Sequence, residues 1–413
     1  MSWIPARTAL ALLKVQPQTL YANVSRGRIR AKPDPRDPRR GLYHRADVER
    51  LASRGAGRRS AASVAQQAME WGDPVLASGI CTVEHGRLWY RGRDAAELSE
   101  TWTLEQAAGL LWNADNVVFG PVRKRARPRN ASLLSAALST LAARVDLDPP
   151  SWGRARQVLV PEATGLLEDI IVAMLGRAPE AAMPVHQRMA ACWQAPKARD
   201  FLRRALVLLA DHELNASTFA VRVAVSTGTS LSAGLMAGLA TLAGPLHGGA
   251  TLSIRQLCAA AQRDGVAASM RDHIARGYSL PAFGHPLYPD KDPRAVALLA
   301  RFKISKIYAA MRDEGVALTG EQPNIDFALA SICDTFGLPP EAPFVIFALA
   351  RCVGWIAHAL EQIETGHLIR PRARYNGRSR ADGQDAAAFP YGNPLEKAVK
   401  SEVEFFLLRS ATA

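Results

Sequence analysis

The chain has 413 residues, of which 48 % are hydrophobic and 22 % charged, which excludes a disordered protein and predicts roughly two or three packed units. The net charge of +13 is unevenly placed: residues 1–60 carry 14 Lys and Arg against 4 Asp and Glu, and the remainder carries 37 against 34. The basic character therefore belongs to the N-terminal segment, and we expect the two parts to have different partners.

Residues 1–55 predict a small helical domain. Apolar spacing indicates one helix over 5–15, and a second starts near Pro17 and ends at Gly27. The residues that would pack these two helices across a tight turn, as in a helix-turn-helix, are Ala9, Leu13, Val15, Leu20 and Val24. A basic loop follows, with Arg36, Arg39 and Arg40. A third helix is predicted after it, with Asp47 in its first turn.

This domain resembles the DNA-binding part of MerR-type and excisionase-like winged helix proteins. The resemblance implies that the second helix enters the major groove and that the wing touches phosphate. The side chains that would face DNA are Gln18, Thr19, Tyr21, Arg26 and Arg28. We therefore predict DNA as a partner of residues 5–53, with the alternative that this basic domain docks on protein or serves the oligomer.

Residues 56–74 are small, polar and basic, and indicate a linker. The segment ICTVEHGRLWYRG after it predicts a β-hairpin that turns at His85 and Gly86, because β-branched and aromatic residues flank the turn. Long Ala- and Leu-rich periodic segments follow, which predict a mostly α globule of at least two layers over 75–413. The basic stretch 123–130 indicates a solvated loop.

The rest of the chain indicates a cytoplasmic protein without a membrane partner. Residues 9–13 are too short for the apolar part of a secretory signal. Residues 223–254 lack Asp, Glu, Lys and Arg, but their small residues, with Pro245 and His247, favour a buried helix over a membrane span. Five scattered cysteines without metal-type spacing favour reduced thiols; they are Cys81, Cys192, Cys258, Cys333 and Cys352. No metal is expected.

Three short motifs each place one proton-handling side chain among glycines and prolines. They are GPLHGGA with His247, AFGHPLYPDKDPR with His285, and PNIDFA with Asp326. Two histidines, a carboxylate and spare arginines suit a reaction that makes an enol and joins it to the carbonyl of an anionic acid. One base must remove a carbon-bound proton, and two donors must stabilise the oxygens that become charged. Arginines suit the acid, since their planar fork binds a carboxylate through two hydrogen bonds.

With these motifs in this order, residues from about 79 to the C-terminus resemble the citrate synthase family, which covers citrate and 2-methylcitrate synthases. Further matching segments are LWYRGRDAAEL, DHELNASTFAVRV, ARCVGWIAHALEQ and LIRPRARY. The resemblance implies a large helical domain (75–248 and 338–413) and a small one (249–337) that closes over the substrate. It also implies a homodimer, whose interface lies at or near the uncharged helix before His247, and a coenzyme A thioester as co-substrate with no tightly bound cofactor.

The resemblance implies roles for the three proton-handling residues. Asp326 would take a proton from the α-carbon of the acyl-CoA. His247 would hydrogen-bond the thioester oxygen, and His285 would donate to the carbonyl of oxaloacetate as the new bond forms. Because PNID often opens a helix, Asp326 could instead be an N-cap.

The resemblance also implies the substrate contacts. The residues that would bind oxaloacetate are His212, Arg294, Arg351 and Arg370. Arg370 would reach across from the other subunit, with Arg372 as its competitor, and His212 has the alternative of pairing with Asp211 or Glu213. His358 is expected to be structural.

Coenzyme A would lie against Pro281, Ala282, Phe283 and Gly284, and here the sequence departs from the family pattern. Ala282 replaces a glycine, Pro286 and Leu287 replace the usual pair, and Pro289 stands where a cation commonly meets a CoA phosphate. Lys291 or Arg276 would then supply the missing charge, or CoA would bind less tightly.

The resemblance predicts a transferase of the tricarboxylic acid cycle, which converts acetyl-CoA, oxaloacetate and water into citrate and CoA. A close alternative uses propionyl-CoA and makes 2-methylcitrate, since one methyl group changes the demand on the pocket only slightly. Another alternative, motivated by the basic N-terminal segment, is a DNA-binding regulator whose synthase-like body senses a metabolite.

Overall fold

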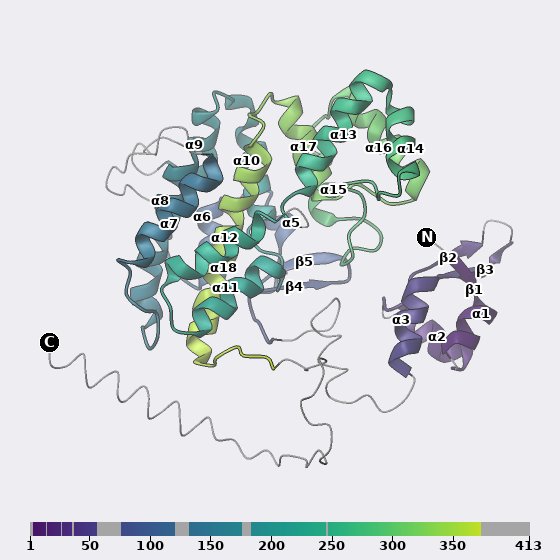
Figure 1. Cartoon of the computed structure of the whole chain (residues 1–413), viewed down its shortest axis with the longest axis horizontal. Coiled ribbons are helices and arrows are strands. Elements are labelled where there is room, and N and C mark those ends of the chain that lie inside the picture. Colours follow the sequence, from purple (N-terminus) through teal and green to yellow (C-terminus); the bar gives the residue numbers. More distant parts are fainter. Residues whose placement is uncertain are drawn as a thin grey trace, which may run out of the picture. The chain divides into compact units, whose positions relative to one another are not determined.

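The computed structural model describes residues 3–13, 15–25, 27–34, 37–55, 76–119, 132–175, 183–244 and 247–372 (Figure 1). Contacts divide the chain into two compact units, Met1–Arg370 and Pro371–Ala413, and every element described below belongs to the first. The predicted linker and the basic stretch 123–130 lie outside the described residues, as do Arg26, Arg36 and Pro245.

The N-terminal domain combines three helices with a small antiparallel sheet. Its elements are β1 (Trp3–Pro5), α1 (Ala6–Leu13), α2 (Pro17–Ser25), β2 (Ala31–Asp34), β3 (Asp37–His44) and α3 (Arg45–Gly55). The strand order is β1-β3-β2. The core contains Ile4, Ala9, Leu13, Leu20, Ile29, Tyr43 and Val48, with Val15 and Val24 packed against it. The three predicted helices and the predicted packing of the first two are therefore confirmed.

The predicted basic loop of this domain is wrong, because most of it is strand. Residues 31–34 pair with 37–44, and Tyr43 lies opposite Ala31 on one side and Ile4 on the other. Tyr43 is 4 % exposed, so burial of its ring holds the middle strand in place although prolines and arginines are poor strand formers. The assignment of the domain to winged helix-turn-helix proteins stays a prediction.

The helical body begins with the predicted hairpin. It joins β4 (Cys81–Glu84) to β5 (Arg87–Tyr90), and β6 (Arg93–Asp94) pairs with β5. His85 and Gly86 form the turn with φ of 51° and 72°, the left-handed conformation that a tight two-residue hairpin turn requires. The predicted hairpin and its turn are confirmed.

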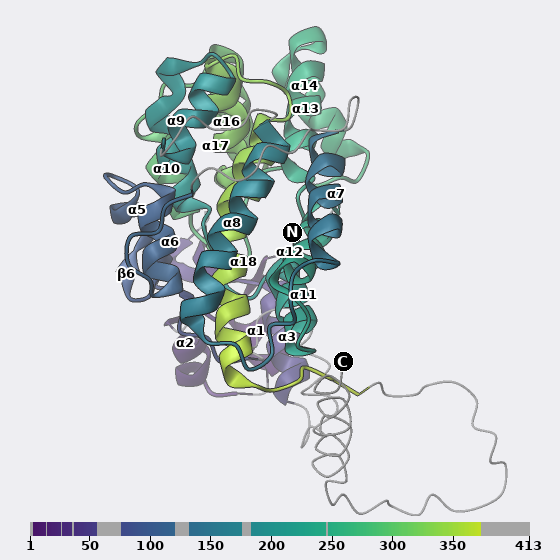
Figure 2. The same ribbon diagram turned by 90° about the vertical axis from the view of Figure 1, so that its left-hand side faces the viewer.

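A large group of helices surrounds α18 (Ala342–Thr365). The group contains α5 (Ala95–Leu98), α6 (Leu104–Trp112), α7 (Leu133–Val145), α8 (Arg156–Leu175), α9 (Val185–Cys192), α10 (Arg199–Leu208), α11 (Ala216–Ser226) and α12 (Leu231–Leu242). Helix α18 contacts α6, α8, α10, α11 and α12, and it runs through the middle of the group in Figure 2. Pro343 in its first turn and left-handed Gly366 after its last turn set its bounds.

Among the described residues, α18 is the one helix long and apolar enough to cross a membrane. Since 89 % of its apolar window is buried inside the protein, it is a core helix. The uncharged region 223–254 is not one span either, because it is divided among the end of α11, α12 and the start of α13 (Ala250–Asp264).

A second group of helices has a core of its own. Helices α13, α14 (Val266–Ala275) and α16 (Lys306–Thr319) pack together, with α17 (Ile325–Thr335) beside α13 (Figure 1). This core includes Ile254, Leu257, Met270, Leu280, Phe283, Tyr308, Met311 and Phe327. Helices α15 (Pro293–Leu299) and α17 also contribute side chains to the larger core. The predicted division into a large and a small domain stays a prediction, which this separate core supports.

Candidate active site

Four of the predicted site residues lie at or just before the start of a helix. Asp326 is the second residue of α17 and Arg294 the second residue of α15, while His247 lies three residues before α13 and His212 four residues before α11. Helix N-termini carry partial positive charge and unpaired N–H groups, so they favour anions and disfavour protonated histidines.

The segment before α11 is held against α18 by buried polar contacts. The backbone N–H of Gly354 donates to the carbonyl of Ala210 at 2.9 Å. Asp211 is fully buried, and its Oδ2 lies 3.3 Å from Nε2 of buried His358. Burial alone would raise the pKa of Asp211, but His358 and Arg351 outweigh it and hold this pKa below its usual value. The expectation that His358 is structural agrees with this contact.

His212 bonds to neither acidic neighbour, so that alternative is wrong. Asp211 is engaged elsewhere, and Oε1 of Glu213 accepts from the backbone N–H of Val83 at 2.6 Å. Nε2 of His212 lies 2.9 Å from the hydroxyl of Tyr288, which comes from a segment about 75 residues further along the chain. This contact places His212 against the motif that contains the second predicted proton donor.

The segment between His285 and Arg294 forms one compact polar cluster. The ring centroids of His285 and Tyr288 are 4.9 Å apart, and the guanidinium of Arg294 lies over the Tyr288 ring at 5.3 Å. Asp292 accepts from Nε of Arg294 at 2.9 Å and from Nη2 at 2.8 Å. Burial would lower the pKa of Arg294, but Asp292 outweighs it and raises this pKa. Arg294 is therefore a buried, fixed cation.

A backbone contact determines which nitrogen of His285 carries the proton. The N–H of Leu287 donates to Nδ1 at 3.1 Å, so Nδ1 is an acceptor. In a neutral imidazole the proton is then on Nε2. His285 is thus a hydrogen-bond donor through Nε2, as a residue that stabilises a developing alkoxide must be.

A serine hydroxyl also lies against His247. Nε2 of His247 lies 2.8 Å from Oγ of Ser217, which also accepts from Nε1 of Trp355 at 3.2 Å. Oγ donates to Oδ1 of Asn215 at 2.7 Å, and that oxygen also accepts from the N–H of Thr218 at 3.0 Å. Because the hydroxyl has one proton, this arrangement makes Nε2–H of His247 the donor to Oγ. Turning the hydroxyl towards Nε2 instead places the imidazole proton on Nδ1.

Asp326 is not the N-cap of α17, so that alternative is wrong. Asn324 is the N-cap, and its Oδ1 accepts from the N–H of Asp326 at 3.0 Å. Oγ1 of Thr251, on α13, donates to Oδ1 of Asp326 at 2.6 Å. Burial raises the pKa of Asp326 above its usual value, while the bond from Thr251 opposes that rise. A carboxylate with a raised pKa is the better proton acceptor.

The predicted coenzyme A stretch, 281–284, is tied by its backbone to the start of α17. The N–H of Gly284 donates to the carbonyl of Gln322 at 2.8 Å, and the N–H of Asn324 donates to the carbonyl of Ala282 at 3.0 Å. Ala282 has a φ of 65°, which a glycine would adopt with less strain. The outer two residues of the stretch are partly exposed and the inner two are buried. Its role in binding coenzyme A stays a prediction.

The two prolines that change this part of the family pattern lie on the surface, whereas Ala282 is buried. Pro286, Pro289 and Lys291 are exposed. Arg276, the other cation predicted to compensate, is exposed too, but its Nη2 pairs with Asp272 at 2.8 Å. Lys291 is therefore the more available cation of the two.

Burial keeps the three histidines neutral. It lowers the pKa of His247 to about 4, with a contribution from Arg351, and that of His285 to about 4, with a contribution from Arg294. It also lowers the pKa of His212 well below its usual value, and Arg294, Arg351 and the other two histidines add to this effect. The structure thus brings the other four side chains within electrostatic reach of His212.

These pKa values predict that the protein loses stability in mild acid. His247 and His285 bind protons near pH 4 when folded and near 6.5 when unfolded. As the pH falls from 6.5 towards 4, the unfolded chain takes up these protons first, so the free energy of unfolding declines over that window. Above pH 6.5 the contribution of the two histidines to this free energy is complete. Urea denaturation at several pH values should show this slope, and His247→Gln and His285→Gln should each reduce it. The matched change His367→Gln, at an exposed histidine, should leave the slope unchanged. Equal slopes in all variants would contradict the prediction.

Arg370 is not brought to this cluster. Arg351 lies inside α18, and the helix continues to Thr365, which at 1.5 Å per residue is about 20 Å further along its axis. Arg370 follows that end and is exposed. It therefore lies outside the site of its own chain. Arg372 also lies beyond the end of α18.

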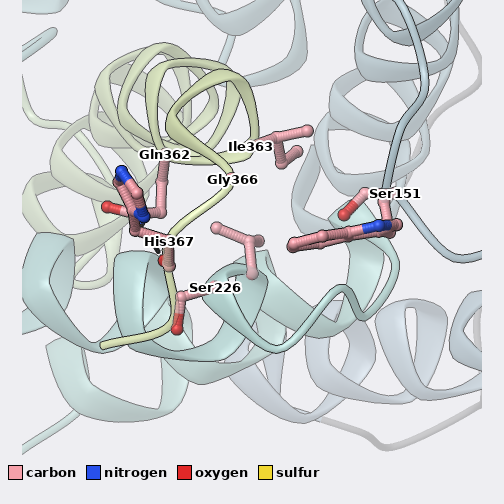
Figure 3. A pocket seen from close by; sticks show the side chains of 8 residues that line it. Ser151, Ser226, Gln362, Ile363, Gly366 and His367 are labelled. Carbon is pink, nitrogen blue, oxygen red and sulfur yellow. Dashed lines mark hydrogen bonds between the residues drawn. The ribbon is translucent and has the colours of Figure 1, made fainter. Parts of the chain in front are cut away.

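The chain turns beside a small pocket after α18 (Figure 3). The pocket is lined by Ser151, Trp152, Val225, Ser226, Gln362, Ile363, Gly366 and His367. Nε2 of Gln362 donates to the carbonyl of His367 at 2.9 Å, and the N–H of Ile369 donates to Oγ of Ser226 at 3.1 Å. These bonds hold the segment that leads to Arg370 against the end of α11. The pocket contains none of the predicted site residues.

Four polar residues of the cluster were not singled out from the sequence. They are Ser217, Thr251, Tyr288 and Asp292. Asp292 had a usable signal, because it precedes Arg294 by two residues in the same DPR motif. The partners of Ser217 and Thr251 lie 30 and 75 residues away in the chain, so no local pattern pointed to them. Within the described residues, no group of three or more His, Cys, Asp or Glu could hold a metal ion.

Comparison with known proteins points to one family. The family model described as "Citrate synthase, C-terminal domain" matches residues 69–372. Citrate synthase 2 of Bacillus subtilis is 33 % identical over 242 residues, which cover 55 % of this chain and 61 % of the relative. 2-Methylcitrate synthase 2 of Corynebacterium glutamicum is 34 % identical over 190 residues, 43 % of this chain and 49 % of the relative. In both cases the match spans less than two thirds of the relative's own length.

A solved structure shows the same fold. It is the ternary complex of carboxymethyl coenzyme A and oxaloacetate with citrate synthase from Thermoplasma acidophilum, which superimposes with a TM-score of 0.62 at 24 % identity. The superposition covers 76 % of this chain and 96 % of that chain. The mostly helical architecture predicted from the sequence is therefore confirmed.

Proposed function

Because this chain belongs to the citrate synthase family, we propose that it is an acyltransferase that condenses an acyl-CoA with oxaloacetate and then hydrolyses the thioester. With acetyl-CoA, the acyl donor that we favour, the reaction takes up one water and gives citrate and CoA. The observation that carries the proposal is the constellation itself. Two neutral histidines lie near a half-buried carboxylate and two buried arginines.

The arginines suit the oxo-acid. Nη2 of Arg351 is buried and has no hydrogen-bond partner among the described residues. Leaving a buried donor unpaired costs free energy, which a substrate carboxylate would recover. Asp292 occupies Nε and Nη2 of Arg294, so its Nη1 is available for the other carboxylate. Both arginines also act on His212, because each of them lowers the pKa of its imidazole.

The proton transfers follow from the three remaining side chains. Asp326 takes a proton from the acyl α-carbon. His247, once the Ser217 hydroxyl turns towards its Nε2, donates Nδ1–H to the thioester oxygen as that oxygen gains charge. The α-carbon then bonds to the carbonyl carbon of oxaloacetate, whose oxygen receives a hydrogen bond from Nε2–H of His285. Water finally cleaves the thioester, which releases CoA and the tricarboxylate. Closure of the small domain would exclude bulk water during the first steps.

We propose a homodimer in which Arg370 completes the site of the partner subunit. Its position about 20 Å beyond Arg351 along α18 keeps it from its own site. An exposed arginine in a segment fixed against α11 is available to a second copy of the chain.

The test is CoA release by the purified protein with oxaloacetate and either acetyl-CoA or propionyl-CoA, followed by the appearance of free thiol. The family covers relatives that bear both names, citrate synthase and 2-methylcitrate synthase, so the ratio of kcat/KM decides the donor. Absence of turnover with both donors, in folded protein that binds oxaloacetate, would overturn the enzymatic proposal and favour a metabolite sensor.

A second function, DNA binding by the N-terminal domain, is favoured by the surface of α2. Leu20 is buried on one side of this helix, whereas Gln18, Thr19 and Tyr21 are exposed on the other. Arg28, just after the helix, is exposed too and forms no ion pair with another described residue. An exposed polar and aromatic helix face next to an unpaired cation suits a groove lined by phosphates.

We expect duplex DNA to bind this domain with an affinity that falls as salt rises, because the binding releases counterions. Arg28→Ala should weaken binding and reduce the salt slope by about one. Arg45→Ala removes the same charge, but Arg45 is paired with Glu49 at 2.7 Å, so it should change the slope much less. Fluorescence anisotropy of labelled duplex across a salt series measures both. No binding even at low salt would refute this function without affecting the first.

A further inference from the structure

A threonine on one helix binds the carboxylate on another. Thr251 is the second residue of α13, is 8 % exposed, and donates through Oγ1 to Oδ1 of Asp326 at 2.6 Å. Asp326 is the second residue of α17, and its backbone is fixed by the N-cap Asn324. The two helix starts therefore meet through this one side-chain bond.

The bond from Thr251 engages only one of the two carboxylate oxygens of Asp326. A threonine hydroxyl has a single proton, so the donation occupies Oδ1. Among the residues that the structure describes, Oδ2 of Asp326 has no hydrogen-bond partner. A carboxylate held at one oxygen and at its backbone cannot rotate freely, and Oδ2 is then the oxygen with both lone pairs uncommitted.

We propose that Thr251 is a positioning residue for Asp326, holding Oδ1 so that Oδ2 is the oxygen that removes the α-proton of the acyl-CoA. This inference rests on the proposed condensation. It adds that the bond from Thr251 links Asp326, the proposed base, to the segment that carries His247, because Thr251 lies only four residues after that histidine. The base on α17 is then tied to α13, which begins three residues after the donor for the thioester oxygen.

The same bond adjusts the basicity of Asp326. Donation to the ionised form stabilises it, whereas burial and the nearby Asp292 disfavour it. Arg294, at the start of α15, also favours the ionised form. Thr251 is the neutral donor in this set, so removing its hydroxyl changes the balance without changing the net charge.

Thr251→Val removes the hydroxyl at nearly constant volume and tests the inference. We expect the acid limb of the kcat/KM profile to move up by about one pH unit, because a hydrogen bond to a charged group is lost. Exchange of the acyl α-hydrogen for solvent deuterium should fall about tenfold at neutral pH. Thr251→Ser keeps the donor and should restore both. Ser253→Ala removes another hydroxyl from the first turn of α13, one that bonds only to the carbonyl of Gly249, and should change neither.

A readout independent of turnover separates this inference from the proposed function. Infrared difference spectra against Asp326→Asn isolate the carboxyl band of Asp326, whose titration should shift to higher pH in Thr251→Val and not in Ser253→Ala. An inactive wild-type protein that shows this shift would refute the condensation and keep the contact. An active protein whose profile and band are the same in Thr251→Val as in wild type would overturn the inference. Circular dichroism of each variant confirms that it is folded.

Discussion

Asp326→Asn is expected to lower kcat for CoA release roughly 10³-fold, since positioned general bases contribute about 10²–10⁴ to a rate. Asparagine has the shape of aspartate and still offers an oxygen to Thr251, which donates to the native carboxylate at 2.6 Å. It cannot accept the α-proton. The change therefore removes the proton acceptor and leaves the surrounding contacts in place.

The prediction also separates oxaloacetate binding from turnover. Oxaloacetate should bind Asp326→Asn with nearly unchanged affinity, because its carboxylates are assigned to Arg294 and Arg351 rather than to Asp326. Titration calorimetry measures that binding, and the thiol assay measures turnover. Asp334→Asn is the matched control, as Asp334 is exposed on the same helix and its side chain accepts a hydrogen bond from Ser305 at 3.3 Å. Turnover within tenfold of wild type in Asp326→Asn would mean that another group is the base.

The sequence predicted the chemistry of the site better than its geometry. Residues such as His247 and Asp326 stand in motifs where glycine and proline set the local backbone, so their identity is a local property. What orients them is not local. The tautomer of His247 depends on Ser217 and Trp355, and the basicity of Asp326 depends on Thr251, each reached only after distant helices pack.

The same distinction separates the correct and incorrect fold predictions. The hairpin at His85 and Gly86 was predictable because two residues with positive φ are required in sequence. Strands β2 and β3 were not, because their pairing depends on burial of Tyr43 between two partner strands. The alternative that Asp326 is the N-cap of α17 could not be settled from the sequence, because Asn324 and Asp326 are both good caps and the structure uses Asn324.

Gly354→Ala should damage both the core and the oxaloacetate site. A methyl group on this residue of α18 would meet the carbonyl oxygen of Ala210 and Oδ1 of Asp211, whose buried side chain is held by His358. The backbone before α11 would have to move away, breaking the bond from the Gly354 N–H to Ala210. We expect the free energy of unfolding to fall by about 2–3 kcal/mol, as for other overpacked cores.

The catalytic consequence follows because His212 is the next residue after Asp211. If the segment shifts by about 1 Å, the oxo-acid contacts are misplaced, and kcat/KM for oxaloacetate should fall by up to about 10²-fold in protein that is still folded. Gly165→Ala is the matched control, since Gly165 lies within α8 and a methyl group there meets nothing within 4 Å. It should raise stability by about 0.5–1 kcal/mol and leave kcat/KM unchanged.

Chemical denaturation and the thiol assay on the two glycine variants distinguish two effects of replacing a glycine. One is the loss of close approach by another backbone, and the other is the gain in helix propensity. Propensity alone predicts that both alanine changes stabilise the protein. Close approach predicts opposite signs, with the loss confined to the helix position against which the His212 segment rests. If Gly354→Ala were as stable and active as wild type, the backbone of 210–212 would have to be free to move away from α18. The site could not then owe its geometry to this contact.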